Sequence, residues 1–137
     1  MATTKPIEGG KHAAPSARDL TAYQWRAAKI LPGVNDGKAR NAALRNKIDV
    51  AGAGDDVFGV IENPGAAAGK TTTLQTLGRT KLKVSQDVQP TDKLRAGADG
   101  VGVKAVAGEA YFFTVMESGK AGSIVPVEFD RGTLPDA

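Results

Sequence analysis

The segment from Gly65 to Thr71, Gly-Ala-Ala-Ala-Gly-Lys-Thr, comes closest to a known chemical motif, because it follows an apolar run and resembles a phosphate-binding P-loop. A P-loop has four residues between its glycines and opens a helix, so that backbone N–H groups converge on phosphate. Here three residues separate Gly65 from Gly69, and the threonine-rich run that follows favours a strand. We therefore expect a turn between two strands rather than a nucleotide site.

The other residue types that carry chemistry are scarce. The sequence has no cysteine and a single histidine, His12, so thiolate nucleophiles and the usual nucleophile–base and metal clusters lack members. Asp55 and Asp56 are adjacent carboxylates, but neighbours on a strand point to opposite faces and do not share an acid–base site. We expect a protein that is not an enzyme and that uses no metal or cofactor.

The positive charge is concentrated in the first part of the chain. Residues 1–50 carry nine Lys and Arg against four acidic residues, a net +5, whereas residues 51–137 carry nine against eleven, a net −2. A basic N-terminal part suits an arm that lies on an acidic surface. No apolar run approaches the ~20 residues of a membrane span, and the N-terminus lacks a signal peptide. We expect synthesis in the cytoplasm and no membrane partner.

Residues 51–130 have the pattern of a small β domain. Short β-prone runs alternate with glycine, asparagine and aspartate turns, and about seven such strands fit a β-barrel or β-sandwich. The expected strands are Val57–Ile61 paired with a threonine-rich strand from Thr71, Thr80–Val84, Leu94–Ala96 paired with Val101–Lys104 through Asp99-Gly100, Tyr111–Met116 as a central strand, and Ile124–Phe129 as an edge strand because of Pro126.

The first fifty residues look different from this β domain. Residues 1–20 are expected to be an extended or disordered arm, and residues 21–50 a connecting segment with one short helix or strand. Ser16–Leu31 has a capping-box start and an apolar helical face, which slightly favours a helix; in a strand, Tyr23, Trp25 and Ala27 would share one side. Residues 131–137 are expected to be a tail.

The order of the motifs over residues 51–129 resembles that of the capsid decoration, or cement, proteins of tailed bacteriophages. In that family an apolar strand containing Phe-Gly-Val, an alanine–glycine turn, a strand with a Gly-x-x-x-Val element, an Asp-Lys strand, an Asp-Gly hairpin and a closing strand follow one another. The corresponding segments here are Val57–Val60, Pro64–Gly69, Gly78–Val84, Asp92–Leu94, Ala98–Ala105 and Gly119–Val127.

This resemblance implies a β-tulip-like domain on the outer surface of a mature phage capsid, where it would brace the major capsid protein. It also implies a homo-oligomer, with a trimer favoured over a dimer. The arm and the segment after it are then expected to make the partner contacts, through Lys5, Ile7, Lys11, Arg18, Trp25 and Arg26. Two alternatives stay open: another virion component, or a basic β-barrel that binds single-stranded nucleic acid through such residues as Lys81 and Lys83.

Overall fold

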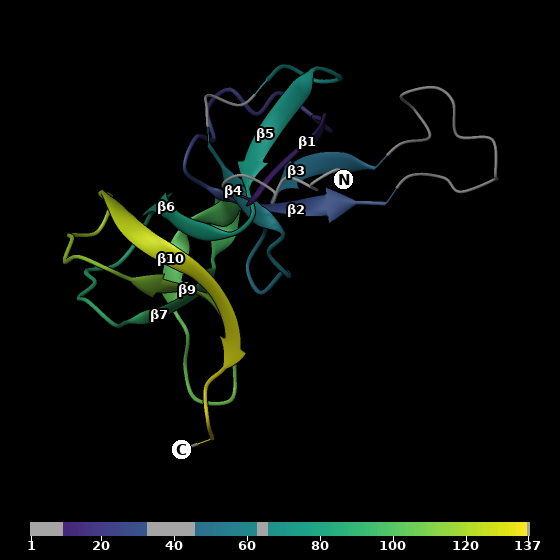
Figure 1. Cartoon of the computed structure of the whole chain (residues 1–137). Helices are drawn as coiled ribbons and strands as arrows, with labels where there is room; N and C mark the ends of the chain where they lie inside the picture. Colours follow the sequence, from purple (N-terminus) through teal and green to yellow (C-terminus); the bar gives the residue numbers. More distant parts are fainter. Residues whose placement is uncertain (1–9, 33–45, 63–65, 137) are drawn as a thin grey trace, which may run out of the picture.

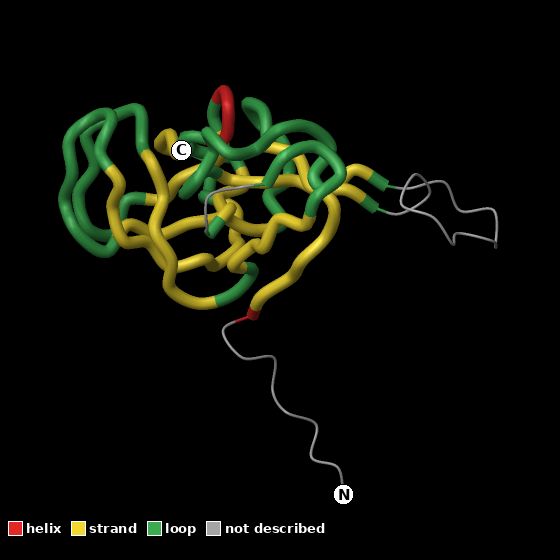
Figure 2. Tube along the Cα trace, turned by 90° about the horizontal axis from the view of Figure 1, so that it is seen from above, coloured by secondary structure: helices red, strands yellow, loops and turns green. Residues whose placement is uncertain are grey.

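The structure is a computed structural model that describes residues 10–32, 46–62 and 66–136. Within them the strands form two five-stranded antiparallel sheets, which lie at the upper right and lower left of Figure 1. The first sheet has the order β1-β5-β4-β2-β3, with β1 Lys11–Pro15, β2 Ala27–Leu31, β3 Lys47–Val50, β4 Gly59–Ile61 and β5 Thr71–Gln75. The second has the order β6-β10-β9-β7-β8, with β6 Gly78–Lys83, β7 Lys93–Ala96, β8 Gly102–Lys104, β9 Ala110–Val115 and β10 Ile124–Thr133. Strands and loops make up nearly all of the described chain in Figure 2, so the expected mainly-β class is confirmed.

Each sheet curls until its two edge strands meet. In the first sheet, Ser16 bridges Ile48 in parallel, and Ala17 N–H donates to the Ile48 carbonyl at 2.8 Å. In the second sheet, Val84 bridges Gly102 in parallel, and a neighbouring N–H donates to the Gly102 carbonyl at 3.1 Å. The chain therefore forms two small, partly closed barrels, the first barrel from residues 10–77 and the second barrel from residues 78–134.

The two barrels have the same topology and the same register. Counted within each barrel, both sheets have the order first-fifth-fourth-second-third strand. Between the fourth and fifth strands, Ile61 faces Leu74 in the first barrel, and Val115 faces Val127 in the second. Within each strand, the residue numbers of equivalent positions differ by a constant, and the same constants relate the two closing bridges. The chain is thus an internal structural repeat.

The turns repeat as well as the strands. Gly69 N–H donates to the Ser16 carbonyl at 2.9 Å, and its counterpart Gly122 N–H donates to the Val84 carbonyl at 2.7 Å. Both glycines have positive φ, 80° and 90°. This left-handed backbone explains why glycine stands in both turns although few other equivalent positions carry the same residue.

Both barrels have an apolar interior, but the large and small side chains that fill it stand at different positions in the two barrels. Buried Ile48 belongs to the same apolar cluster as the small Ala28 in the first barrel, whereas Gly102 lies beside Leu94 and Leu82 at the equivalent place in the second. A Cβ on Gly102 would come within 2.6 Å of Leu82 Cδ2 and 3.0 Å of Leu94 Cδ1. Large and small side chains have exchanged positions, so both interiors reach close packing with different residues.

The helix favoured over Ser16–Leu31 is wrong. Strand β2 begins only at Ala27, and the preceding residues form turns that cover one end of the first barrel with the buried Leu20. Leu20 N–H bonds the Ala66 carbonyl at 2.9 Å, and Trp25 N–H bonds the Ile61 carbonyl at 2.7 Å. Long-range partners therefore satisfy this backbone, which overrides a weak local helix preference.

The expected boundaries after residues 20 and 50 are also wrong. Strand β1 lies in the expected arm, and β2 and β3 lie in the expected connecting segment, so residues 10–50 supply three of the five strands of the first sheet. The expected tail is wrong as well in part, because β10 continues to Thr133. Without β1 to β3 the first barrel could not close over its apolar interior, and this is the physical reason that these residues fold with the rest.

Three sequence-based expectations for the β region are confirmed and one is wrong. Strands β4 and β5 pair, β7 and β8 pair through Asp99-Gly100, and β9 is the central strand of its sheet. Strand β10, however, lies between β6 and β9 despite Pro126. The Pro126 carbonyl accepts from Met116 N–H at 3.0 Å, so Pro126 turns its backbone polar atoms toward the β9 side. Met116 lies beyond the last residue of β9, and the N–H that proline lacks would therefore fall outside the paired part of the β9–β10 ladder.

Candidate partner-binding surface

The two barrels meet at a junction made of backbone hydrogen bonds, two arginines and buried side chains. Buried Ala27, Val57 and Val60 of the first barrel belong to the same apolar cluster as the interior of the second. Polar links cross the junction from Lys83 N–H to the Trp25 carbonyl at 2.8 Å, Gly54 N–H to the Ala96 carbonyl at 3.1 Å, Arg26 Nη1 to the Asp99 carbonyl at 2.9 Å and Arg131 Nη2 to the Val57 carbonyl at 2.7 Å. The barrels are thus held as one body, with two surface depressions beside their contact.

The first depression is a groove of about 310 Å³ around Trp25, named here the Trp25 groove. Its lining is Trp25, Glu62, Arg79, Thr80, Lys81 and Pro126, which come from both barrels. The Trp25 backbone has φ 63°, and its half-buried ring packs against the apolar cluster at the junction. Lys81 Nζ lies 5.6 Å from the ring centroid, a cation–π distance. The Trp25 groove therefore brings together an aromatic ring, a proline and two cationic side chains.

The charge of this groove is more positive than its residue list suggests. Glu62 is ion-paired with Lys11 of β1, so its negative charge is already compensated. Arg79 and Lys81 are exposed on the outer side of β6. The Thr80 hydroxyl is buried and has no hydrogen-bond partner among the described residues. The exposed Arg79 and Lys81 therefore make the groove attractive to anionic groups.

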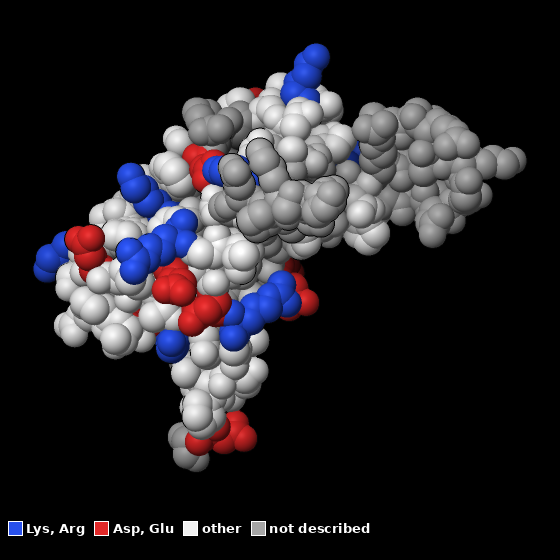
Figure 3. Space-filling model, in the orientation of Figure 1, with Lys and Arg blue, Asp and Glu red and all other residues white. Residues whose placement is uncertain are grey.

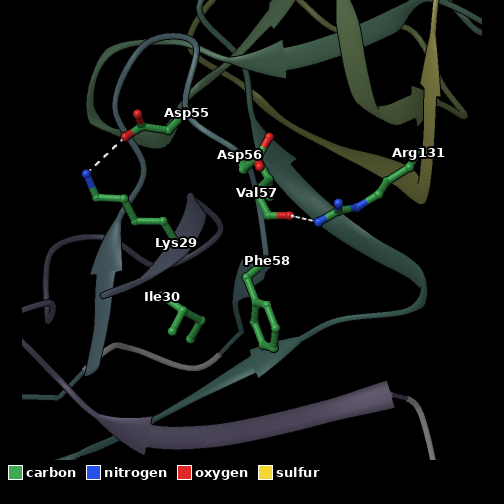
Figure 4. A pocket seen from close by; sticks show the side chains of 7 residues that line it. All are labelled: Lys29, Ile30, Asp55, Asp56, Val57, Phe58 and Arg131. Carbon is green, nitrogen blue, oxygen red and sulfur yellow. Dashed lines mark hydrogen bonds and ion pairs between the residues drawn. The ribbon is translucent and has the colours of Figure 1, made fainter. Parts of the chain in front are cut away.

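The second depression is a pocket of about 320 Å³ around Phe58, named here the Phe58 pocket (Figure 4). Phe58 and Ile30 form its apolar side, and Asp56 and Arg131 lie at the other side. The Phe58 ring is 39% exposed, although it makes an edge-on contact with His12 at 5.0 Å. An exposed aromatic ring in a pocket is the kind of surface that protein interfaces commonly use.

The charges beside Phe58 are arranged by the loop before β4. Lys29 Nζ lies 3.0 Å from Asp55 Oδ2, which also accepts from Gly52 N–H at 2.8 Å. These bonds lower the pKa of Asp55, first through Gly52 N–H and then through Lys29. The paired carboxylate therefore holds the loop in place.

The residues expected from sequence to contact a partner fall into three groups. Lys5 and Ile7 lie outside the described residues. Lys11 pairs with Glu62, Arg18 Nε donates to Asp49 Oδ1 at 2.6 Å, and Arg26 bonds across the junction. The bond to Asp49 raises the pKa of Arg18. Three of the expected contact residues are thus engaged within the chain, and Trp25 is the one that lines a groove.

Sequence reasoning missed the partners of Trp25 and the exposure of Phe58. The alternation of β6 did predict that Lys81 faces outward, but nothing local indicated that Trp25 would come to lie over it. Phe58 stands in an apolar run that looks like core, so no sequence signal separated it from buried neighbours. Both features depend on contacts between distant segments.

The described part of the P-loop-like segment, from residue 66, forms a turn followed by β5, as expected, and Lys70 is exposed at the end of the turn. Within residues 10–32, 46–62 and 66–136, no three His, Asp or Glu side chains gather as a metal site would need. No helix in this part of the chain is long and apolar enough to cross a membrane.

The charged side chains do not form a field of one sign. Figure 3 shows lysines and arginines interspersed with acidic side chains over the surface formed by β6, β9 and β10. Nucleic-acid binding relies on a continuous basic groove with several stacking aromatics, whereas the Trp25 groove offers one aromatic ring. On this face of the molecule the charges are therefore mixed.

The fold is shared with a phage protein of known structure. The crystal structure of the N base of the head fiber gp8.5 from bacteriophage phi29 matches with a TM-score of 0.69 and 16% sequence identity. The match covers 90% of this chain and 96% of that one. No protein-family model matches the sequence, and no curated protein does. The likeness establishes the fold and spans both barrels together.

Proposed function

We propose that this chain is a structural protein of a phage virion, and that it binds the outer surface of the capsid with the major capsid protein as its partner. The observation that carries the proposal is the likeness to the base of a phage head fiber over 90% of this chain. A base that carries a fiber on a head needs a surface that holds on to the head. The sequence resemblance of residues 51–129 to capsid decoration proteins supports the same role.

The Trp25 groove is the proposed capsid contact. It combines the Trp25 ring with exposed Arg79 and Lys81, and aromatic and arginine side chains are the common anchors of protein interfaces. An acidic, apolar capsid segment would complement it. The N-terminal residues Lys5 and Ile7 add a second contact, and a homo-oligomer, with a trimer favoured, would multiply contacts that are weak singly.

Co-sedimentation of the purified full chain with DNA-free shells, expanded and unexpanded, tests this function. We expect saturable binding to expanded shells. The variants Arg79→Glu and Lys81→Glu should weaken it at least about tenfold, since they reverse charge at the anchor. The matched control Lys120→Glu removes an exposed lysine outside the groove and should bind as wild type. Equal binding by all three variants would reject the Trp25 groove as the contact.

The second candidate function is binding of single-stranded nucleic acid, favoured by the single observation that Trp25 stacks with Lys81. A parallel assay with single-stranded DNA separates the two functions. Binding to DNA with steep salt dependence, and none to shells, would replace the capsid proposal.

A further inference from the structure

The two barrels carry the same charged pocket at equivalent positions. Lys29 pairs with Asp55 at 3.0 Å in the first barrel, and their counterparts Arg95 and Glu109 pair at 3.1 Å in the second. In each barrel the cation comes from the second strand and the carboxylate from the loop before the fourth strand. The pocket is therefore a feature of the repeat.

One of these pockets is narrowed by the other barrel and its phenylalanine is covered, whereas the other pocket leaves its phenylalanine exposed. Phe112, the counterpart of Phe58, is only 5% exposed, whereas Phe58 is 39% exposed. Arg131 lies over the Phe112 ring at 5.2 Å, and the first barrel's loop residues Gly54 and Asp55 line the same pocket. A loop of the first barrel thus forms one wall of the second barrel's pocket, which keeps a volume of about 190 Å³, whereas the Phe58 pocket keeps about 320 Å³ (Figure 4).

The loop that lines the second barrel's pocket also exists twice. In the first barrel it is Gly52–Asp55, where Asp55 N–H donates to the Gly52 carbonyl at 3.1 Å and Gly54 has φ 78°. In the second barrel it is Val106–Glu109, where Glu109 N–H donates to the Val106 carbonyl at 3.0 Å and Gly108 has φ 85°. The carboxylates close both loops onto the first N–H at 2.8 Å. The second loop has the shape of the first and carries Val106, which is 62% exposed.

We propose that the Phe58 pocket receives the Val106–Glu109 loop of a second copy of this chain, so that the junction between the barrels is repeated between copies. The pocket and the loop lie on different barrels, and one copy therefore presents both halves of the contact. Gly108 and Glu109, the counterparts of Gly54 and Asp55, would cover the exposed Phe58 ring, and burial of the exposed Val106 side chain in the same contact would supply a hydrophobic contribution. This inference rests on the homo-oligomeric part of the proposed function and not on capsid binding.

The junction between copies is weaker than the junction within the chain. Pro15 stands where Lys83 donates its N–H to the Trp25 carbonyl, and proline has no N–H. Gly108 N–H is already bonded to the Leu134 carbonyl at 3.1 Å, whereas its counterpart Gly54 bonds across the junction. With fewer hydrogen bonds and no tether, association depends on protein concentration.

Sedimentation velocity of the full chain without shells, over a range of concentrations, tests the proposal. Wild type is expected to associate as concentration rises. Phe58→Glu and Val106→Glu should each move the midpoint at least about tenfold higher, because each places a charge in the contact. The control Ile124→Glu changes another exposed apolar residue, which is 48% exposed and is the first residue of β10. This variant should associate as wild type. Circular dichroism and thermal melting confirm that each variant is folded.

Mixing the two disruptive variants gives a sharper result. The Val106→Glu copy keeps an intact pocket and the Phe58→Glu copy keeps an intact loop, so an equimolar mixture should form dimers near the wild-type midpoint. A wild type that stays monomeric, variants that associate as wild type, or a folded mixture that stays monomeric would each overturn the proposal. Shell binding is measured separately, so loss of shell binding with intact association would remove only the capsid function.

Discussion

Trp25 and Thr91 occupy the same position in the two barrels, and both have a left-handed backbone, with φ of 63° and 75°. Each donates its N–H to the last residue of the fourth strand of its barrel: Trp25 to Ile61 at 2.7 Å and Thr91 to Val115 at 2.8 Å. The chain must reverse here to enter β2 and β7. The strained conformation is therefore a property of the repeated fold, held by the pairing that follows it.

Replacement of Thr91 by glycine should stabilise the protein. A β-branched residue with positive φ destabilises the folded state by about 1–2 kcal/mol. Glycine removes this strain but loses about 0.5–1 kcal/mol of conformational entropy on folding, which offsets part of the gain. We expect Thr91→Gly to raise the free energy of unfolding by about 0.5–1 kcal/mol in urea denaturation. The control Thr133→Gly, on exposed extended backbone at the end of β10, should lower it. A loss at both positions would mean that Thr91 is not strained.

Gly100 limits how closely the barrels approach. It has φ 73°, and a Cβ there would lie 2.5 Å from the Ala27 carbonyl oxygen and 2.8 Å from Val50 Cγ2. Gly122 has φ 90° but open space around its Cβ position. Gly100→Ala should therefore cost at least about 3 kcal/mol, and Gly122→Ala about 1–2 kcal/mol from backbone strain alone. Equal losses in thermal or urea unfolding would show that the junction yields easily.

Ser16 and Thr72 close the first barrel with a buried polar pair. Their hydroxyl oxygens are 2.6 Å apart, and Ser16 Oγ donates to the Lys70 carbonyl at 2.8 Å. The second barrel has valines, Val84 and Val125, at these positions. Ser16→Ala should cost about 1–2 kcal/mol, because it leaves Thr72 without that partner. The double variant Ser16→Ala/Thr72→Val should cost less than the sum of the single variants in urea unfolding, and strict additivity would contradict the coupling.

Asp55 should make stability depend on pH in the acidic range. Its pKa is lowered in the folded state from 3.8, first by Gly52 N–H and then by Lys29, so its contribution is present above pH 3.8 and is lost as pH falls through the lowered pKa. Because the side chain is 39% exposed, Asp55→Asn should cost less than about 1 kcal/mol at pH 7. The difference from wild type should close below pH 3.8. Asp56→Asn, on an exposed neighbour, is the control and should change little.

Part of the fold could be predicted because it is encoded locally. The hairpin of β7 and β8 turns at Asp99 and Gly100, which have φ 55° and 73°, and aspartate–glycine is favoured for that backbone. The alternation of Thr80, Leu82 and Val84 predicted which side of β6 faces inward. These signals depend only on residues that are neighbours in the sequence, so the sequence alone is enough to predict them.

The sequence by itself therefore determined the β class, most strands after residue 56 and the turns between them. Only the tertiary structure decided that residues 10–50 fold with them, that the chain is one barrel built twice, and that Phe58 is exposed while Phe112 is covered. The physical reason is that these features depend on pairing between distant segments and on total volume. Ile48 and Gly102 can fill equivalent places because their neighbours compensate, so the two copies of one fold share little sequence outside residues 51–58 and 105–112.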